Sequence, residues 1–233
     1  MTYDHGAHRR SDAPDSELQG VLESARHWED FYGQQELRWS GRPNPVLVDV
    51  ATRRLPRTAL DVGCGEGGDA IWLAQRGWHV TAVDISTTVL ARAAATAERA
   101  GVGARIDWQR HDLARTFPAG SYDLVSAQYL HSPVEFPRED VLRAAARAVA
   151  PAGLLLIVGH AAAPPWAEHH HHEPDVHFAT PDEVLESLAL LPAQWRIDAA
   201  ETSVRQATGP DGRAGMLSDS VVAATRLGMT APD

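Results

Sequence analysis

The run Ala59-Leu60-Asp61-Val62-Gly63-Cys64-Gly65-Glu66-Gly67-Gly68 decides how this chain folds. Its first four residues predict a short, mostly apolar strand, and the glycines that follow predict a tight turn. Residues 69–76 then have the pattern of a helix that Gly77 closes. Glycines let such a turn adopt positive φ angles and bring its backbone close to a ligand. A strand, a glycine-rich turn and a helix in this order predict a nucleotide-binding device.

Strand-like and helix-like segments alternate around this turn. After the first strand, further apolar segments are expected to form strands at residues 79–83, 105–109, 122–127 and 154–158. Helices are expected between the strands, and one before the first strand, at residues 46–55, 69–76, 86–100 and 139–150. This alternation predicts an α/β fold with a mostly parallel sheet.

The C-terminal third of the chain departs from this alternation. Thr180-Pro181-Asp182-Glu183 has the pattern of a capping box and predicts a helix that runs to about Leu190. Residues 194–206 and 220–227 have strand-like patterns, and Gly209-Pro210-Asp211-Gly212 predicts a turn between them. We therefore expect an antiparallel pair of strands at the edge of the sheet.

Composition narrows the classes of function. A chain of 233 residues suits one α/β domain, and its formal net charge of −10 argues against a nucleic-acid binder, which needs a basic face. The single cysteine, Cys64, allows no internal disulfide and suits a reducing compartment. No apolar stretch reaches the ~18 residues of a membrane span, and residues 1–20 are polar, unlike a signal peptide. A cytoplasmic protein that binds neither nucleic acid nor membrane is expected.

Acidic residues stand at the ends of three successive predicted strands. Asp61 precedes the first glycine by two positions, Asp84 ends the second strand, and Asp112 follows the third. A carboxylate at Asp61 would repel the pyrophosphate of a dinucleotide but would attract an ammonium group. S-adenosylmethionine (SAM) has an α-ammonium and no phosphate. Asp84 can take the ribose hydroxyls, and Asp112 is placed to reach an adenine amino group. The three carboxylates fit an adenosyl amino acid better than a dinucleotide.

Two alternatives stay open at this point. The glycines at positions 63, 65 and 68 also satisfy the dinucleotide pattern G-x-G-x-x-G, so a nicotinamide oxidoreductase is a rival class. Such an enzyme usually has a separate substrate domain, for which the C-terminal third is too short. Alternatively, Asp84 and Asp112 only cap the ends of their strands.

Residues 60–67 look like the SAM-binding signature of class I methyltransferases, and later motifs follow the order of that family across residues 55–160. These later motifs are Val83-Asp84-Ile85-Ser86, His111-Asp112-Leu113, Tyr122-Asp123-Leu124-Val125 and Pro151-Ala152-Gly153-Leu154-Leu155. The resemblance implies an enzyme that transfers a methyl group from SAM. It also implies a Rossmann-like, doubly wound α/β fold whose mostly parallel seven-stranded sheet has an antiparallel C-terminal edge strand.

The flanking segments suggest a subgroup and a domain plan. Trp28-Glu29-Asp30-Phe31-Tyr32-Gly33 resembles an N-terminal segment of the tellurite-resistance and thiopurine methyltransferases, and the Asp211-Gly212 hairpin resembles their C-terminal end. The aromatic residues of the first segment belong either to a lid or to the core face of a helix. The expected parts are a disordered tail at 1–20, a helical lid segment at 21–45, and a methyltransferase domain at 46–228 with a substrate-side loop at about 160–180.

The resemblance also implies which residues contact the cofactor. Those that would hold the methionine part of SAM are Asp61, Gly63, Cys64, Gly65 and Gly67. Those that would surround the adenosine are Asp84, Ile85, Asp112 and Leu113. Gln128 would lie near the sulfonium, and Trp39 and Arg42 are candidates for a lid over the cofactor. Cys64 is alternatively a nucleophile, but its place in the cofactor turn favours a packing role.

His131 follows the fourth predicted strand and is a candidate general base, with a packing histidine as the alternative. A thiol acceptor is partly ionised at neutral pH, whereas a phenol or alcohol needs a base. Because no Lys or Glu stands as an evident base in the catalytic loops, a small-molecule thiol is slightly preferred to O- or N-methylation. A SAM-binding protein without catalytic activity would have the same cofactor loop and stays a further alternative.

The run His169-His170-His171-His172 is the most unusual feature of the loop after the fifth strand. It fits a solvated loop, part of an acceptor pocket or proton-handling lid, or a metal site that includes nearby acidic residues. Adjacent side chains of an extended run point to opposite faces, and the i, i+4 spacing of a helical metal site is missing. No metal ligand is therefore assigned.

Overall fold

The computed structural model of the chain describes residues 13–34, 41–166, 177–209 and 212–228. A seven-stranded sheet forms the centre of these ranges. Its strands are β1 (Thr58–Val62), β2 (His79–Asp84), β3 (Ile106–Arg110), β4 (Tyr122–Gln128), β5 (Val149–His160), β6 (Trp195–Thr208) and β7 (Ala214–Arg226). The described helices are α1 (Ala13–Gly33), α2 (Pro45–Thr52), α3 (Gly68–Gln75), α4 (Thr87–Arg99), η1 (Gly103–Arg105), α5 (Arg138–Arg147) and α6 (Pro181–Leu188).

The strands follow the order β3-β2-β1-β4-β5-β7-β6. Strands β1 to β5 pair in parallel, and β7 runs antiparallel to both of its neighbours, β5 and β6. The predicted α/β fold with a mostly parallel seven-stranded sheet is therefore confirmed. The C-terminal strand is antiparallel, as predicted, but it lies between β5 and β6, so that β6 forms the edge. Strand β7 also begins at Ala214 rather than at residue 220, because it pairs with almost the whole of β6.

The core occupies both faces of the sheet. Every residue from Leu154 to Val158 in β5 is buried, as expected for a central strand that is covered on both sides. One face packs against α5 and α6 through residues that include Leu142 and Val184. The other face packs against α2 and α3 through residues that include Leu47 and Leu73. Polar side chains can meet a ligand at the ends of the strands, where these layers stop.

Side-chain caps fix where several helices begin. The Asn44 side chain accepts a hydrogen bond from the Val46 backbone N–H at 2.9 Å, at the start of α2. The predicted capping box of α6 is confirmed, because Thr180 and Glu183 each accept a hydrogen bond from the backbone N–H of the other. Each cap satisfies an N–H group that a helix leaves open and stabilises the helix by about 1 kcal/mol.

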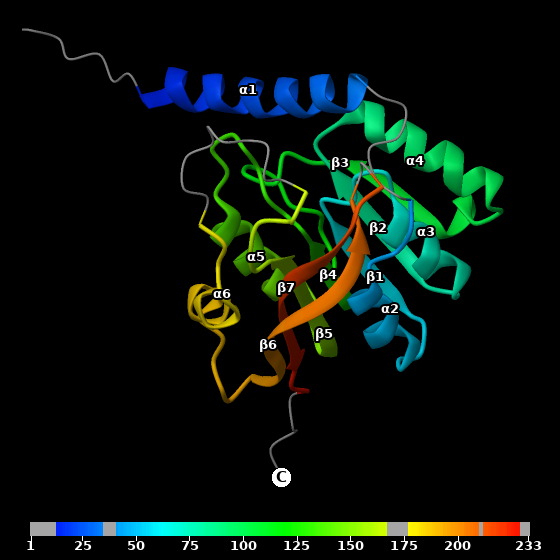
Figure 1. The fold of residues 1–233 in the computed structure, drawn as a ribbon, viewed down its shortest axis with the longest axis vertical. Helices are drawn as coiled ribbons and strands as arrows, with labels where there is room; N and C mark the ends of the chain where they lie inside the picture. Colours follow the sequence, from blue (N-terminus) through cyan, green and yellow to red (C-terminus); the bar gives the residue numbers. More distant parts are fainter. Residues whose placement is uncertain (1–12, 35–40, 167–176, 210–211, 229–233) are drawn as a thin grey trace, which may run out of the picture.

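Helix α1 crosses the end of the domain at which the parallel strands finish (Figure 1). It begins at Ala13, whereas the sequence prediction extends a disordered tail to residue 20. Pro14 is compatible with a helix start, because proline is tolerated in the first helical turn. The aromatic segment at 28–32 lies on this helix, and Tyr32 is buried against the domain.

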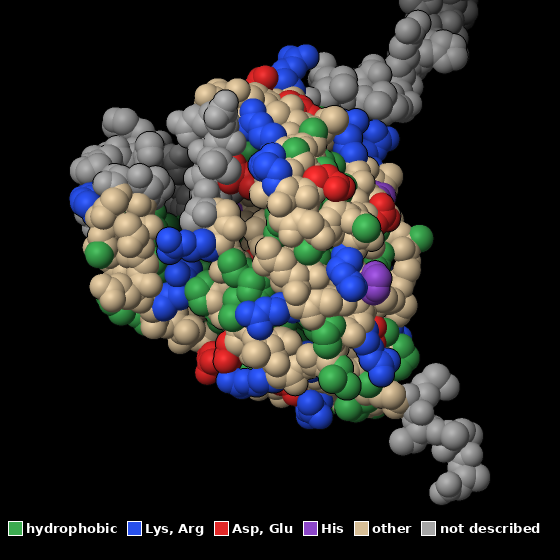
Figure 2. All heavy atoms as spheres, turned by 90° about the vertical axis from the view of Figure 1, so that its right-hand side faces the viewer, with side chains coloured by type: hydrophobic (Ala, Val, Ile, Leu, Met, Phe, Trp, Pro, Cys, Tyr) green, Lys and Arg blue, Asp and Glu red, His purple; other side chains and the backbone are tan. Residues whose placement is uncertain are grey.

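Basic side chains are scattered over the face that α2, α3 and α4 form, with fewer acidic side chains between them (Figure 2). This mixed pattern differs from the basic stripe expected of a surface that binds nucleic acid. Of the helices in the described ranges, none is long and apolar enough to span a membrane.

Candidate functional site

The glycine-rich turn between β1 and α3 is held tightly by its neighbours. Gly63 and Gly67 have φ angles of +73° and +76°, which residues with a side chain rarely adopt. A Cβ at Gly63 would lie 2.6 Å from Leu130 Cδ1, and a Cβ at Gly67 would lie 2.6 Å from Trp108 Cη2. The loop after β4 and the side chain from β3 therefore fix the path of the turn, and only glycine fits at these two positions.

Asp61 lies near the end of β1 and is 2% exposed. Its Oδ2 atom is buried and has no hydrogen-bond partner among the described residues. Burial raises the pKa of Asp61 well above its ordinary value, and the carboxylates of Asp69 and Asp84 raise it further. A cationic ligand would stabilise this side chain, because it would replace the solvation that the carboxylate loses on burial.

Asp84 ends β2 and ties this strand to the glycine turn. Its Oδ2 accepts a hydrogen bond from the Gly65 backbone N–H at 3.0 Å, and its Oδ1 accepts one from the Ser86 backbone N–H at 3.0 Å. Burial raises the pKa of Asp84, and these N–H groups oppose that shift. The side chain thus acts as a strand-end cap, but each of its oxygens has a second lone pair that can accept a ligand hydroxyl.

Two more buried oxygens have no partner among the described residues. Asp112 follows β3, and its Oδ2 is unpaired, whereas its Oδ1 accepts a hydrogen bond from the Ala114 N–H at 3.2 Å. Gln128 ends β4; its Nε2 donates to Ser126 Oγ at 2.8 Å, and its Oε1 is unpaired. Buried polar atoms in folded proteins nearly always have partners, so these oxygens indicate positions at which a ligand supplies donors.

The smaller apolar residues of the predicted site are partly buried. Ile85 directly follows the carboxylate of β2, and Leu113 packs against the core cluster on the α5 side of the sheet. Cys64 lies in the glycine turn. Burial is the largest cause that raises the pKa of its thiol well above the ordinary value, and three nearby aspartates raise it further. The thiol therefore stays protonated at neutral pH, which favours a packing role over a nucleophilic one.

The C-terminal half of α1 docks on the start of α4. Glu29 accepts hydrogen bonds from Ser86 Oγ at 3.0 Å and from the backbone N–H groups of the next two residues at 2.5 and 3.2 Å. Tyr32 is 5% exposed, and its hydroxyl oxygen would lie 3.2 Å from a Cβ placed on Gly65. Helix α1 therefore covers the glycine turn next to the end of β2.

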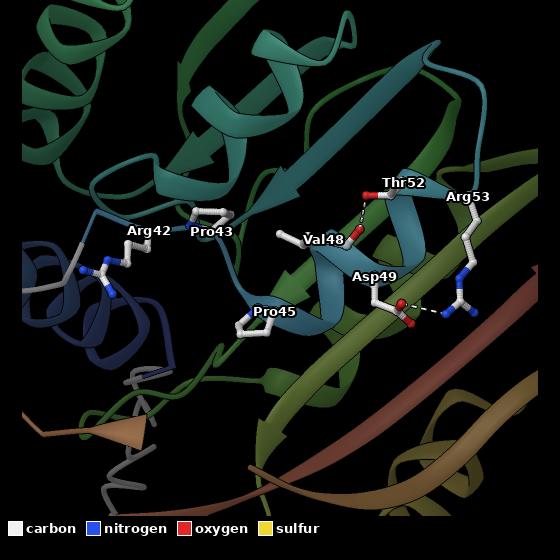
Figure 3. A pocket seen from close by; sticks show the side chains of 7 residues that line it. All are labelled: Arg42, Pro43, Pro45, Val48, Asp49, Thr52 and Arg53. Carbon is white, nitrogen blue, oxygen red and sulfur yellow. Dashed lines mark hydrogen bonds and ion pairs between the residues drawn. The ribbon is translucent and has the colours of Figure 1, made fainter. Parts of the chain in front are cut away.

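The segment before α2 approaches the same turn from another side. The carbonyl oxygen of Arg42 would lie 3.1 Å from a Cβ placed on Gly68, and the Asn44 N–H donates to Asp69 Oδ1 at 2.6 Å. The exposed Arg42 side chain and residues of α2 line a hollow of about 560 Å³ (Figure 3). This hollow lies along α2 and includes none of the strand-end carboxylates. Trp39, the other lid candidate, lies outside the described residues.

A second group of polar side chains lies at the neighbouring ends of β4, β5, β6 and β7, and we call it the β4–β5 cluster. Its members are Tyr129, His131, His160, Arg205 and Asp219. The Tyr129 hydroxyl donates to Asp219 Oδ1 at 2.8 Å and accepts from Arg205 Nη2 at 2.9 Å. Arg205 Nε pairs with Asp219 Oδ2 at 2.6 Å, and Asp219 is fully buried. The ring centroid of His160 lies 4.5 Å from that of Tyr129 and 6.1 Å from that of His131.

Both histidines of the β4–β5 cluster are neutral at neutral pH. His131 keeps part of its surface exposed, but its Nε2 would lie 3.2 Å from a Cβ placed on Gly159, so the ring packs on β5. Burial first, and then the charge of Arg138, lower the pKa of His131 to about 4. Burial also lowers the pKa of His160, whose Nδ1 is buried without a partner among the described residues.

The histidine run at 169–172 lies outside the described residues. Across the described ranges, no group of three or more His, Cys, Asp or Glu residues is arranged to hold a metal ion. His177, which follows the run, contacts Glu183 at 3.2 Å.

The donor and acceptor groups at the strand ends fit SAM. The α-ammonium, the ribose hydroxyls and the adenine amino group of SAM all donate hydrogen bonds. Asp61, Asp84 and Asp112 present acceptors at the ends of three successive strands, and two of them have an unpaired buried oxygen. A pyrophosphate at the glycine turn would instead meet the buried carboxylates of Asp61 and Asp69 and be repelled.

Comparison with known proteins identifies the segment that contains this site. Residues 59–153, from β1 to the first part of β5, match a family model described as a methyltransferase domain. This match covers less than half of the chain and agrees with the resemblance of its motifs to class I SAM-dependent methyltransferases. The match includes the glycine turn and all the strand-end carboxylates described above.

Two curated relatives show what kinds of protein contain similar domains. Ubiquinone biosynthesis O-methyltransferase from Sodalis glossinidius is 30% identical over 151 residues, which are 63% of this chain and 59% of that protein. Ribosomal RNA small subunit methyltransferase C from Chromohalobacter salexigens is 35% identical over 120 residues, which are 50% of this chain and 34% of that protein. The chain thus spans less than two thirds of the length of either relative.

Two solved structures share the fold. One, from work on the conversion of a disulfide bond into a thioacetal group during echinomycin biosynthesis, has a TM-score of 0.69 and 23% identity, and covers 88% of this chain and 94% of its own. TehB from Haemophilus influenzae has a TM-score of 0.63 and 18% identity, and covers 85% of this chain and 66% of its own. At these identities the likeness extends to the fold alone, so the tellurite-resistance and thiopurine subgroup stays a prediction.

The structure adds residues that the sequence analysis missed. Asp69 lies in the first turn of α3, where burial raises its pKa to about 6 against the opposing effect of the Asn44 N–H. An acidic residue directly after the glycine run was the available signal. The β4–β5 cluster had no comparable signal, because Tyr129 and Asp219 are 90 positions apart in the chain.

Proposed function

We propose that this protein transfers the methyl group of SAM to a small-molecule acceptor. The observation that carries this proposal is the set of buried, unpaired oxygens of Asp61, Asp112 and Gln128, at the ends of three strands around a glycine turn. These acceptors match the donors of an adenosyl amino acid, and the surrounding negative charge matches its cationic groups. Similarity to an O-methyltransferase of ubiquinone biosynthesis supports a small molecule as the acceptor.

Each strand end takes one part of SAM in this proposal. The methionine part lies against Asp61, Gly63, Cys64, Gly65 and Gly67. The adenosine lies against Asp84, Ile85, Asp112 and Leu113, and the Gln128 side chain lies near the sulfonium. SAM itself supplies an electrophilic methyl group on a positively charged sulfur. The chain binds and orients it, and fixed orientation is the main contribution that a protein makes to such a displacement.

We further propose that residues 21–45 act as a lid on the domain formed by residues 46–228. The support for a lid is that Glu29 and Tyr32 of α1 contact the start of α4 and the glycine turn. Trp39 and Arg42 are further candidates for this lid by sequence alone. A closed lid would exclude water from the reacting groups.

The acceptor carries an ionisable S–H or O–H group in this proposal. The slight preference for a thiol depends on the lack of an evident base, and a thiolate forms without one. The structure places two neutral histidines, His131 and His160, beside the end of β4, and this observation favours a hydroxyl acceptor as the second candidate. By sequence reasoning, His131 is a candidate general base, with a packing role as the alternative.

We also propose that the acceptor is not a nucleic acid and that the protein works in the cytoplasm. The net charge of −10 supports the first point. Similarity to a ribosomal RNA methyltransferase makes RNA a necessary test substrate. A reducing cytoplasm would keep the Cys64 thiol free.

The test is to supply SAM with one candidate acceptor at a time and to measure the release of S-adenosylhomocysteine. The panel is thiophenol, catechol, aniline and a ribosomal RNA fragment. The proposal expects turnover with thiophenol or catechol and none with the RNA. Turnover only with the RNA would contradict it, and SAM binding without any turnover would support a binding protein that lacks catalytic activity.

A further inference from the structure

His160 occupies an unusual position at the end of β5. It pairs in register with Asp219 of β7, and its ring centroid lies 4.5 Å from that of Tyr129 and 6.1 Å from that of His131. Its Nδ1 atom is buried and has no hydrogen-bond partner among the described residues. A buried unpaired nitrogen therefore indicates a contact that is completed by a bound molecule.

This position lies next to the cofactor end of the site. Gln128 ends β4 with its unpaired Oε1, and Tyr129 follows it directly with a φ angle of +49°. Leu130 then lies against Gly63 of the glycine turn, and His131 lies against β5 at Gly159. The loop after β4 thus contacts the glycine turn through Leu130 and the end of β5, which carries His160, through His131.

The Tyr129, Arg205 and Asp219 side chains form a charge-balanced network beside the ring. The ion pair between Arg205 and Asp219 is closed by the Tyr129 hydroxyl, which bonds to both partners. The pKa of Tyr129 is raised to about 12, and burial is the largest cause of this shift. The hydroxyl therefore stays protonated at neutral pH and is not itself a base. The network packs against one face of the His160 ring through Tyr129. The charges of Arg205 and Asp219 are satisfied within the network.

We propose that His160 is the catalytic base for a hydroxyl acceptor, such as a phenol, catechol or enol, and that Tyr129, Arg205 and Asp219 position its ring. This inference rests on the proposed methyl transfer and assigns to His160 the role that sequence reasoning gives to His131. The unpaired Nδ1 accepts the hydrogen bond of the acceptor hydroxyl. His131 packs against the base as a further wall of the acceptor site.

The step balances without another reactant. The acceptor O–H bond breaks and its proton goes to Nδ1 of His160, while the acceptor oxygen forms a bond to the methyl carbon. The bond from that carbon to sulfur breaks, and its electron pair stays on sulfur. His160 then releases the proton to water and returns to its neutral form. A thiol acceptor that is already ionised does not need this proton transfer.

The charged and titratable groups that face His160 set its pH dependence. They are Tyr129 and His131 from the end of β4, Arg205 from β6 and Asp219 from β7, with Arg138 of α5 beyond Gly159. Burial lowers the pKa of His160 below its ordinary value, and Asp219 opposes this shift. The base form is therefore present at neutral pH and is lost only as the pH falls through the lowered pKa.

The test compares His160→Asn with wild-type protein, using catechol and thiophenol as probes. Asparagine keeps a polar group near the Nδ1 position but cannot take up a proton. The proposal expects kcat with catechol to fall by roughly 100-fold or more, and kcat with thiophenol to change by less than about fivefold. The affinity for SAM, measured by calorimetry, should stay within about twofold, and His79→Asn, at the exposed start of β2, should match wild type in every assay.

Two further measurements separate a base from a structural role. In ¹⁵N-histidine NMR spectra of the protein with S-adenosylhomocysteine, catechol should shift the Nδ1 signal of His160, and Tyr129→Phe should change this shift and the pH profile. A His160→Asn variant that methylates catechol at the wild-type rate would overturn the proposal, as would a comparable loss confined to His131→Asn. Failure of wild-type protein to bind SAM would instead contradict the proposed function itself.

Discussion

The carboxylates around the glycine turn and the β4–β5 cluster differ in how their buried charges are compensated. Around the glycine turn, the carboxyl groups of Asp61 from β1, Asp69 from α3 and Asp84 from β2 lie near one another, and burial raises the pKa values of all three. In the β4–β5 cluster, the buried charge of Asp219 is matched by Arg205 and by a tyrosine hydroxyl. The first region is incomplete without a cationic ligand, whereas the second is charge-balanced, and burial lowers the pKa values of its histidines.

This difference separates binding from chemistry. A region with unpaired negative charge gains free energy when it binds a cation, and it therefore suits the sulfonium and ammonium groups of SAM. A balanced region with an unpaired neutral nitrogen suits proton transfer, because the histidine that takes up the proton starts without charge. Changes in the first region should alter SAM affinity, and changes in the second should alter turnover.

The largest expected effect concerns the rigidity of the glycine turn. Gly67→Ala should lower the free energy of unfolding by about 2–4 kcal/mol, because the new Cβ would strain a positive φ angle and collide with Trp108. Gly101→Ala is the matched control, since Gly101 has a φ angle of +72° but no atom within 4 Å of the added Cβ. Urea unfolding of both variants should show a smaller loss for Gly101→Ala, about 1 kcal/mol. Equal losses would mean that the turn is not packed against β3.

Removing the charge of the β1 carboxylate should weaken SAM binding without weakening the fold. Asp61→Asn should lower SAM affinity by roughly 30- to 100-fold, because a charge-assisted contact to the ammonium is lost. Its melting temperature without ligand should not fall, since the change removes a buried carboxylate that two others repel. Asp107→Asn, on an exposed residue of β3, is the control for both measurements. If a folded Asp61→Asn protein bound SAM with unchanged affinity, the glycine-turn region would not be the part of the molecule that determines SAM binding.

The repulsion in the first region predicts a pH dependence of stability without ligand. The pKa of Asp69 is about 6 in the folded protein, against an ordinary value of 3.8. The folded state therefore binds an extra proton between these values, and its stability falls as the pH rises through this interval. Between pH 4 and pH 7, wild-type protein should lose roughly 2 kcal/mol relative to Asp69→Asn in thermal unfolding. If the stabilities of the two proteins changed with pH in the same way, the pKa of Asp69 would not be raised in the folded protein.

The smallest expected effect concerns the contact of α1 with α4. Glu29→Gln removes the negative charge from the N-terminus of α4 and should speed the dissociation of SAM by roughly three- to tenfold. Stopped-flow fluorescence would measure this rate. Glu23→Gln, on an exposed residue of the same helix, should dissociate SAM at the wild-type rate. A Glu29→Gln rate equal to that of wild type would show that α1 does not act as a lid.

Local signals in the sequence were sufficient for the fold and for most of the cofactor region. The alternation of strands and helices, the glycine turn and the capping box at Thr180 each depend on neighbouring residues. The position of β7 inside the sheet was not predictable in this way, because an antiparallel hairpin can add to an edge by either of its strands. Apart from His131, the members of the β4–β5 cluster were missed for a related reason, since they meet only after β4, β5 and β7 have paired.

The central claim is that the acidic strand ends hold the amino-acid part of a sulfonium nucleoside. Isothermal titration of the wild-type protein with SAM, 5′-methylthioadenosine and NAD tests it most directly. Because 5′-methylthioadenosine lacks the ammonium and the positive sulfur, it should bind at least roughly 100-fold more weakly than SAM, and NAD should not bind measurably. Equal affinities for SAM and 5′-methylthioadenosine, or tight binding of NAD, would contradict the account.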